Sequence, residues 1–166
     1  MKAFVKIALS LALIALAAVC YFKFMPASES RSEKAYFYDL EQKQLFVAPR
    51  NSIPPINGIK GAPLAGVRAI VISRTGNPAD TKHREIAYLE KYSPELREKF
   101  ETIQQAEAAG HASDVVIDRH MLPTMTLVRR LNDTEWYPLS SDEGAKITME
   151  WNTPDPDGRV PVVCSP

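Results

Sequence analysis

The segment GVRAIVISR at residues 66–74 carries the strongest β-strand signal in this chain of 166 residues. Its β-branched residues fall on both faces of an extended strand, a pattern typical of a strand at the centre of a sheet. The sequence TGNP at 75–78 follows with turn-forming residues and ends the strand. We therefore arrange the rest of the predicted fold around this segment.

Four other segments favour extended structure. Residues 35–40 (AYFYDL) and 44–48 (QLFVA) are aromatic and β-branched runs with a short gap between them, which predicts a β-hairpin. The prolines of IPPI at 53–56 restrict the residues before them to extended backbone. Residues 85–92 (EIAYLEKY) fit a strand or a helix, and we favour a strand because a helix start follows directly.

That helix start is Ser93, with a proline at the first helical position and an acid in the first turn. The helix should end before Gly110. Its apolar stripe, which we expect to face the sheet, consists of Leu96, Phe100 and Ile103.

The C-terminal third of the chain contains shorter signals. Residues 115–117 and 126–131 read as strands, and 136–138 (WYP) as an extended corner. A short helix should begin at 141–143 and run to about 151. The predicted fold is α+β, with a small, mostly antiparallel sheet and one long helix packed on it.

An uncharged apolar run at residues 7–22 (IALSLALIALAAVCYF) follows Lys2 and Lys6. We expect residues 1–25 to form an uncleaved transmembrane anchor of the inner (cytoplasmic) membrane, with the N-terminus inside. A cleaved signal peptide, or a lipoprotein acylated at Cys20, remains open as an alternative. All three place the rest of the chain outside the cytoplasm.

The predicted organisation behind the anchor has three parts. Residues 26–34 form a polar linker, 35–152 an α+β extracytoplasmic domain and 153–166 a proline-rich, extended tail. If Cys20 lies in the membrane, it cannot pair with Cys164, so the domain has no internal disulfide. Its fold must then depend on its own core.

The charge distribution argues against a nucleic-acid partner. The first 24 residues hold three of the 20 basic residues and none of the 20 acidic ones, so the remainder is slightly acidic. Neutralising phosphates requires clustered lysines and arginines. Adjacent Arg129 and Arg130 lie in a predicted strand and point to opposite faces, so they cannot clamp one anion.

Metal-binding and catalytic signals are weak. The candidates, which share one ten-residue segment, are His111, Asp114, Asp118 and His120. Their spacing matches no known zinc motif, and an extended segment would hold Asp114 and His120 about 20 Å apart. We expect no metal ion and no cofactor, and we assign no catalytic residue. An extracytoplasmic hydrolase using segment 111–120 remains the alternative.

Other sequence features allow two interpretations. His83, between a lysine and an arginine, reads as a turn residue. Aromatic residues could line a binding groove, although core packing is their commoner role. The aromatics in question are Tyr36, Phe37, Tyr38, Phe46, Trp136, Tyr137 and Trp151.

The chain resembles a group of small, membrane-anchored proteins of planctomycete-type bacteria. The matching stretches are YFYDL (36–40), IPPI (53–56), GVRA (66–69), YLEKYSPE (88–95), LVRR (127–130), EWYP (135–138) and PDG (156–158) with Cys164. The group has no assigned activity, so the resemblance implies an envelope setting and no functional residue.

We therefore expect a membrane-anchored extracytoplasmic binding or structural module of the bacterial cell envelope, with a role in secretion or assembly. Its expected partners are the membrane, through the N-terminal helix, and an envelope protein.

Overall fold

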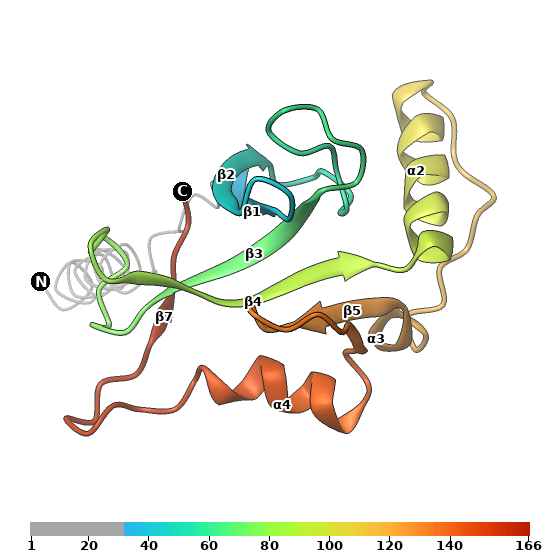
Figure 1. The fold of residues 1–166 in the computed structure, drawn as a ribbon. Helices are drawn as coiled ribbons and strands as arrows, with labels where there is room; N and C mark the ends of the chain where they lie inside the picture. Colours follow the sequence, from blue (N-terminus) through green and yellow to red (C-terminus); the bar gives the residue numbers. More distant parts are fainter. Residues whose placement is uncertain (1–31) are drawn as a thin grey trace, which may run out of the picture. The chain divides into compact units, whose positions relative to one another are not determined.

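The computed structural model describes residues 32–166, which form one folded unit, Ser32–Pro166, around a single sheet (Figure 1). The seven-stranded sheet has the order β2-β1-β3-β4-β5-β6, and β7 pairs with β3. Every strand pair is antiparallel. The strands are β1 (Lys34–Asp39), β2 (Gln44–Pro49), β3 (Gly66–Ser73), β4 (Arg84–Tyr92), β5 (Thr126–Arg129), β6 (Tyr137–Pro138) and β7 (Val162–Val163).

Within residues 32–166, three helices accompany the sheet: α2 (Pro94–Ala108), α3 (Leu122–Met125) and α4 (Asp142–Glu150). The α+β class and the mostly antiparallel sheet are therefore confirmed, as is the central place of β3. Among residues 32–166 no helix is both long and apolar enough to cross a membrane. The predicted anchor at 1–25 and most of the linker at 26–34 lie outside the described residues.

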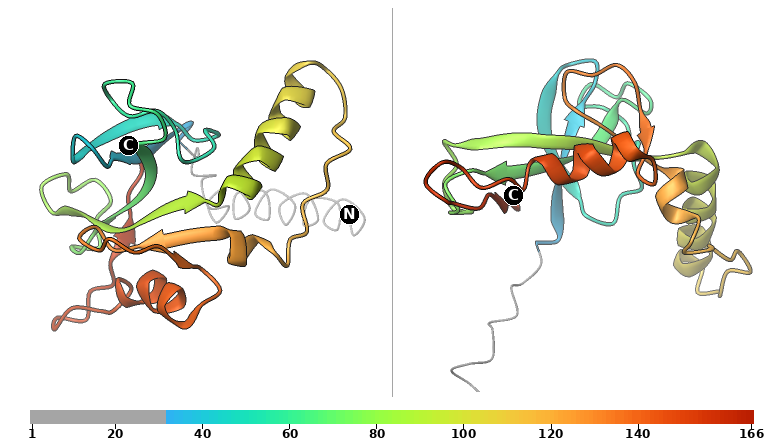
Figure 2. Two further views of the ribbon diagram at one scale, coloured as in Figure 1. Left: turned by 45° about the vertical axis from the view of Figure 1, so that its right-hand side comes forward. Right: turned by 90° about the horizontal axis from the view of Figure 1, so that it is seen from below.

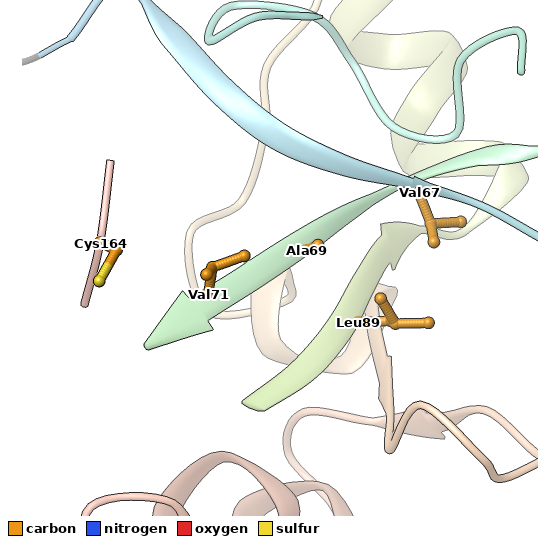
Figure 3. Close-up of a cluster of buried hydrophobic side chains, with 5 residues drawn as sticks. All are labelled: Val67, Ala69, Val71, Leu89 and Cys164. Atoms are coloured by element: carbon orange, nitrogen blue, oxygen red, sulfur yellow. The ribbon is translucent and has the colours of Figure 1, made fainter. Parts of the chain in front are cut away.

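One face of the sheet carries a compact hydrophobic cluster (Figure 3). Its buried members are Val67, Ala69, Val71, Leu89 and Cys164. The half-buried side chains packed against them are Tyr36, Tyr38, Leu40, Ile86, Leu131 and Trp136. We call this side of the sheet the aromatic face.

A β-bulge in β4 decides which of its residues reach the aromatic face. Ile70 pairs with Tyr88 but Val71 pairs with Ile86, which leaves Ala87 without a partner on β3. An extra residue reverses the alternation of side chains beyond it. For this reason Ile86 and Leu89, three positions apart, pack on the same cluster.

The opposite face of the sheet is covered by α4 and by a long loop. Ile147 of α4 and Val128 of β5 are both fully buried. Residues 50–57 cross near β3, where the Arg68 guanidinium donates to the carbonyls of Arg50 and Ser52 at 3.1 and 3.2 Å. None of the helices in residues 32–166 lies over the aromatic face (Figure 2).

The long helix is placed differently from the prediction. Ser93 caps α2 as expected, because its hydroxyl accepts a hydrogen bond from the Leu96 amide at 3.3 Å. Leu96, however, is the only fully buried residue of α2. Phe100 stacks on Tyr92 with 5.0 Å between ring centroids and stays half-buried. The helix continues beyond the end of β4, and α4 lies along the sheet instead (Figure 2).

Two further segments differ from the sequence prediction. Residues 115–117 form no strand, and Val116 is 83% exposed. A short β-branched run is stabilised as a strand only by a neighbouring strand, and this segment pairs with none of the described strands. Residues 162–163 of the predicted tail form β7, and the Cys164 amide donates to the Val71 carbonyl at 2.8 Å.

Asp39, at the end of β1, fastens two loops to the sheet. Its buried carboxylate accepts hydrogen bonds from the amides of Glu41 and Gln42 at 2.9 Å and from that of Ile59 at 2.7 Å. The bond from Gln42, together with those from the other two amides, holds the pKa of Asp39 below its usual value against the opposing effect of burial.

Truncating Phe37 should destabilise the fold far more than truncating Phe100. Phe37 is fully buried and packs on Phe46 with ring centroids 5.9 Å apart. We expect Phe37→Ala to lower the free energy of unfolding by about 3–5 kcal/mol, and Phe100→Ala to lower it by less. Urea melts of the two variants and the wild type provide the measurement, and equal losses would contradict this packing.

Asp39 should also make the free energy of unfolding depend on pH in the acid range. Because its pKa is lower in the folded chain than in the unfolded one, its stabilising contribution is present above about pH 4 and is lost as the pH falls through the folded-state value. Asp39→Asn should therefore be less stable than the wild type at pH 7, with the gap narrowing at low pH. A gap independent of pH, measured by urea melts from pH 7 to pH 2, would refute this role.

Candidate functional site

Two cationic side chains lie against one indole ring on the aromatic face. The Lys91 ammonium is 4.4 Å from the centroid of Trp136, and the Arg129 guanidinium carbon is 4.8 Å from it. Lys91 comes from β4, Arg129 from β5, and Trp136 from the segment that joins β5 to β6. We call these three residues the cation–aromatic site.

Both cations are held in an environment that disfavours their charge. Burial lowers the pKa of Lys91, and the neighbouring Arg129 lowers it further. Burial also lowers the pKa of Arg129, which the charge of Asp133 opposes. Two like charges placed together, neither of them ion-paired with a carboxylate of residues 32–166, favour the binding of an anion, because an anion would relieve both effects.

The hydrogen-bonding capacity of Arg129 is largely unused. One of its terminal nitrogens donates to the Asp133 carbonyl oxygen. Its buried Nε has no acceptor among the described residues. The carboxylate of Asp133 does not fill this need, since it forms an ion pair with Arg130 at 3.3 Å.

A pocket of about 380 Å³ lies beside Arg129. This volume is within the range of about 300–1,000 Å³ that small-ligand sites usually have. Lys43 adds another cation to its wall. The other lining residues are Tyr38, Leu40, Leu131, Asn132 and Thr134.

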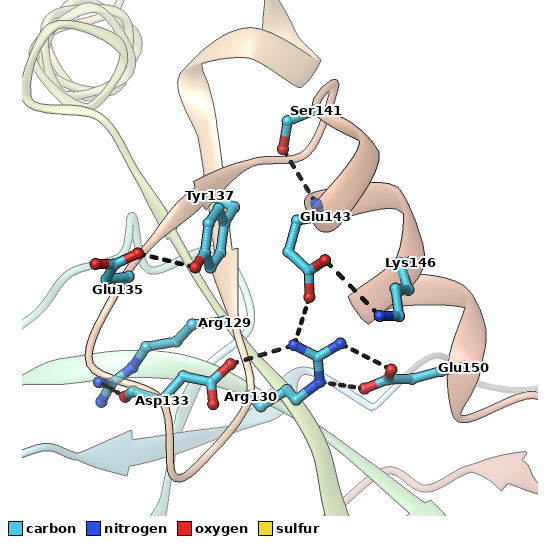
Figure 4. Close-up of polar contacts among 10 residues, drawn as sticks. Arg129, Arg130, Asp133, Glu135, Tyr137, Ser141, Glu143, Lys146 and Glu150 are labelled. Atoms are coloured by element: carbon cyan, nitrogen blue, oxygen red, sulfur yellow. Dashed lines mark hydrogen bonds and ion pairs between the residues drawn. The ribbon is translucent and has the colours of Figure 1, made fainter.

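Arg130, the residue directly after β5, has the opposite surroundings (Figure 4). Its guanidinium contacts Glu150 at 2.6 Å and Glu143 at 2.8 Å, both from α4. The hydrogen bonds that Arg130 donates to the carboxylates of Glu150 and Glu143 raise the pKa of Arg130. The expectation that the two arginines serve no common anion is consistent with these separate partners.

A second cation–aromatic pair lies at the other end of the same face. The Arg84 guanidinium carbon is 5.9 Å from the centroid of the Tyr36 ring, and one of its nitrogens donates to the Tyr36 hydroxyl. Another nitrogen donates to the Pro78 carbonyl at 2.7 Å. The bulge at Ala87 places Arg84 on the same face as Lys91.

The aromatic face lacks its own counterions. Lys91, Arg129 and Arg84 form no ion pair with any carboxylate of residues 32–166. Ion pairs elsewhere in this part of the chain involve helix surfaces, loops and α4. The face is therefore electrostatically complementary to an acidic ligand.

Glu90 lies on the opposite face, where it pairs with Arg68 across the strands. Burial raises the pKa of Glu90, although the nearby Arg68 charge opposes the shift. Burial, with a smaller contribution from Glu90, raises the pKa of Tyr88 to about 12. Since β4 alternates at this point, Glu90 cannot neutralise Lys91.

The residues first considered for catalysis are not brought together. All four, His111, Asp114, Asp118 and His120, are exposed in the segment between α2 and α3. Within the described range of 32–166, no group of three or more His, Cys, Asp or Glu side chains could hold a metal ion.

His83 does have a partner that the sequence did not indicate. Its Nδ1 is 2.8 Å from Oδ2 of Asp80, which also accepts a bond from the Thr75 hydroxyl at 3.2 Å, and Thr75 contacts Ser73 at 2.8 Å. A hydrolytic triad needs its hydroxyl at the other imidazole nitrogen. Here the hydroxyls of Ser73 and Thr75 are linked to the Asp80 carboxylate and not to the imidazole. These contacts therefore order the β3–β4 loop.

Sequence reasoning missed the cation–aromatic site because its members are 38 and 7 positions apart along the chain. One sequence feature could have indicated the site. Arg129 and Arg130 point to opposite faces of a strand, so Arg129 needed a partner on a face where none was predicted. Comparisons with protein-family models, curated proteins and solved structures found no match for this chain.

Removing Lys91 should cost the fold little. Lys91→Met gives up a cation–π contact of about 0.5–1 kcal/mol but also removes a desolvated charge beside Arg129. We expect the free energy of unfolding to change by less than about 0.5 kcal/mol. Arg130→Met, the matched control, leaves three carboxylates without their cation and should lower the free energy of unfolding by about 1 kcal/mol or more. Thermal melts at low salt compare the two, and a larger loss for Lys91→Met would make Lys91 a structural residue.

Proposed function

We propose that this protein is a membrane-anchored, extracytoplasmic binding module of the bacterial cell envelope whose cation–aromatic site recognises an acidic ligand. The observation that carries the proposal is the placement of Lys91 and Arg129 against Trp136 without a carboxylate partner in residues 32–166. A module of this kind recognises its partner without transforming it.

Three properties of the site support binding. An indole ring offers a large, rigid contact surface at low cost in conformational entropy. Two desolvated cations attract a carboxylate more strongly than solvated ones do. The adjoining pocket of about 380 Å³ gives the rest of a small ligand room beside Arg129.

The envelope location rests on the sequence. The apolar run at 7–22, with Lys2 and Lys6 before it, supports an anchor with its N-terminus inside. The resemblance to membrane-anchored planctomycete-type proteins supports the same setting. A carboxyl-rich ligand, such as an acidic segment of a neighbouring envelope protein, fits both the site and this location.

The rival hypothesis, a hydrolase that uses segment 111–120, receives less support. Its two histidines and two aspartates are exposed, and the His120 amide donates to Asp118 in a local turn at 2.9 Å. General acid–base catalysis requires such groups to converge on one substrate position.

Binding can be followed through Trp136 in the full chain, purified in a non-ionic detergent. Trp151 is the other tryptophan, so Trp151→Phe supplies a background with one emitter. We expect an acetylated tripeptide of glutamates to change the emission of Trp136, and the matching glutamine tripeptide to leave it unchanged. Affinity should fall at least tenfold between 50 and 200 mM salt, because the attraction is electrostatic.

The Lys91→Gln/Arg129→Gln double variant should lose this response by at least tenfold. Arg159→Gln is the matched control, since Arg159 is an exposed arginine that pairs with Asp157 at 3.3 Å away from the site. Equal affinities of wild type and double variant, or equal affinities for the two tripeptides, would overturn the proposal.

A further inference from the structure

We infer that the aromatic face binds an extended acidic peptide at two points, with Arg84 and Tyr36 at one end and the cation–aromatic site at the other. The inference rests on the proposed function and adds a second anchor to it. The partner is then a polypeptide segment with two carboxylates that are six positions apart.

The separation of the two anchors comes from β4 itself. Arg84 and Lys91 begin and nearly end this strand, about 20 Å apart at the usual rise per residue. Without the bulge, residues seven positions apart would point to opposite faces. With Ala87 as the extra residue, both cations reach the face that carries the hydrophobic cluster.

The two tyrosines of β1 on this face each lie beside one of the anchors. Tyr36 contacts Arg84, and Tyr38 lines the pocket beside Arg129. Both rings are half-buried, so each keeps an accessible edge. β1 and β4 run in the same direction, because each pairs antiparallel with β3. The row of aromatics therefore follows the line between the cations.

The repeat of this surface matches an extended polypeptide. Tyr36 and Tyr38 are two positions apart in a strand, so their side chains repeat every 6–7 Å, which is also the repeat of one side of an extended peptide. Two acidic residues separated by six positions lie on the same side of such a peptide, about 20 Å apart. A carboxylate could then reach each anchor while apolar residues between them contact the tyrosines.

The nature of the occupant follows from charge and from access. Neither anchor has a carboxylate partner among residues 32–166, and the exposed acids of α4 belong to the opposite face. No helix of the described residues covers the aromatic face. Exposed Leu45 and Val47 of β2 extend its apolar surface beyond Tyr38 and Tyr36, their partners in the hairpin. An acidic peptide with apolar residues in its centre complements all of these features.

The test compares fluorescent peptides of one length and one net charge on the full chain in non-ionic detergent. One peptide carries two glutamates six positions apart, and the other carries them two positions apart, both with serine and valine elsewhere. Fluorescence anisotropy should give the first peptide at least tenfold higher affinity for the wild type. Arg84→Gln should remove this preference and leave the affinity for the second peptide unchanged.

Arg84→Lys serves as the conservative variant, because it keeps the charge at the second anchor, and it should retain at least part of the preference. Arg74→Gln, an exposed arginine paired with Glu85 in the same loop region, should behave like the wild type. Circular dichroism melts confirm that each variant is folded.

The outcomes separate this inference from the proposed function. Equal affinity of the wild type for both peptides would overturn the two-point inference and leave the cation–aromatic site intact. Binding of neither peptide, together with no response to the glutamate tripeptide, would overturn both. A sulfated glycan that binds at least tenfold tighter than the first peptide, and depends on Arg84, would also overturn the assignment of a polypeptide.

Discussion

A β-strand alternates its side chains between two faces, and the bulge at Ala87 breaks this rule once within β4. The break allows Ile86 and Leu89 to pack into the same cluster, and it gives Arg84 and Lys91 a common face. Without it, the start of β4 would present Arg84 to the side covered by loop 50–57 and α4. Both the packing of the sheet and the charge of its open face depend on this one inserted residue.

Charged side chains have different kinds of partner on the two faces of the sheet. On the covered face, Arg130 is surrounded by carboxylates that fix α4 to β5. At the end of β1, Asp39 satisfies three backbone amides and holds two loops. On the aromatic face, Lys91 and Arg129 have an indole ring and each other. Charged groups that support the fold are thus paired, and those of the candidate site are not.

Local signals in the sequence predicted local structure well. The hairpin, the strand at 66–73 and the Ser93 cap depend on residues close together in the chain, and all are present. Errors occurred where a partner is distant. Residues 115–117 have strand propensity but pair with none of the described strands, whereas 162–163 lie in a proline-rich stretch and pair with β3. The site followed the same pattern, because cross-strand register brings Lys91 to Arg129 and no short motif encodes it.

The pairing of β7 with β3 joins segments that are far apart in the sequence, and this affects the order of folding. Ile72 pairs with Val163 across about 90 residues, and Cys164 closes the cluster beside Val71. Closing so long a loop is slow, so β3 must keep part of its edge open while the other strands assemble. An unpaired edge on an apolar strand is a site of mispairing between chains. During biogenesis, the yield of the protein would then be decided by competition between this last intramolecular pairing and association with other copies.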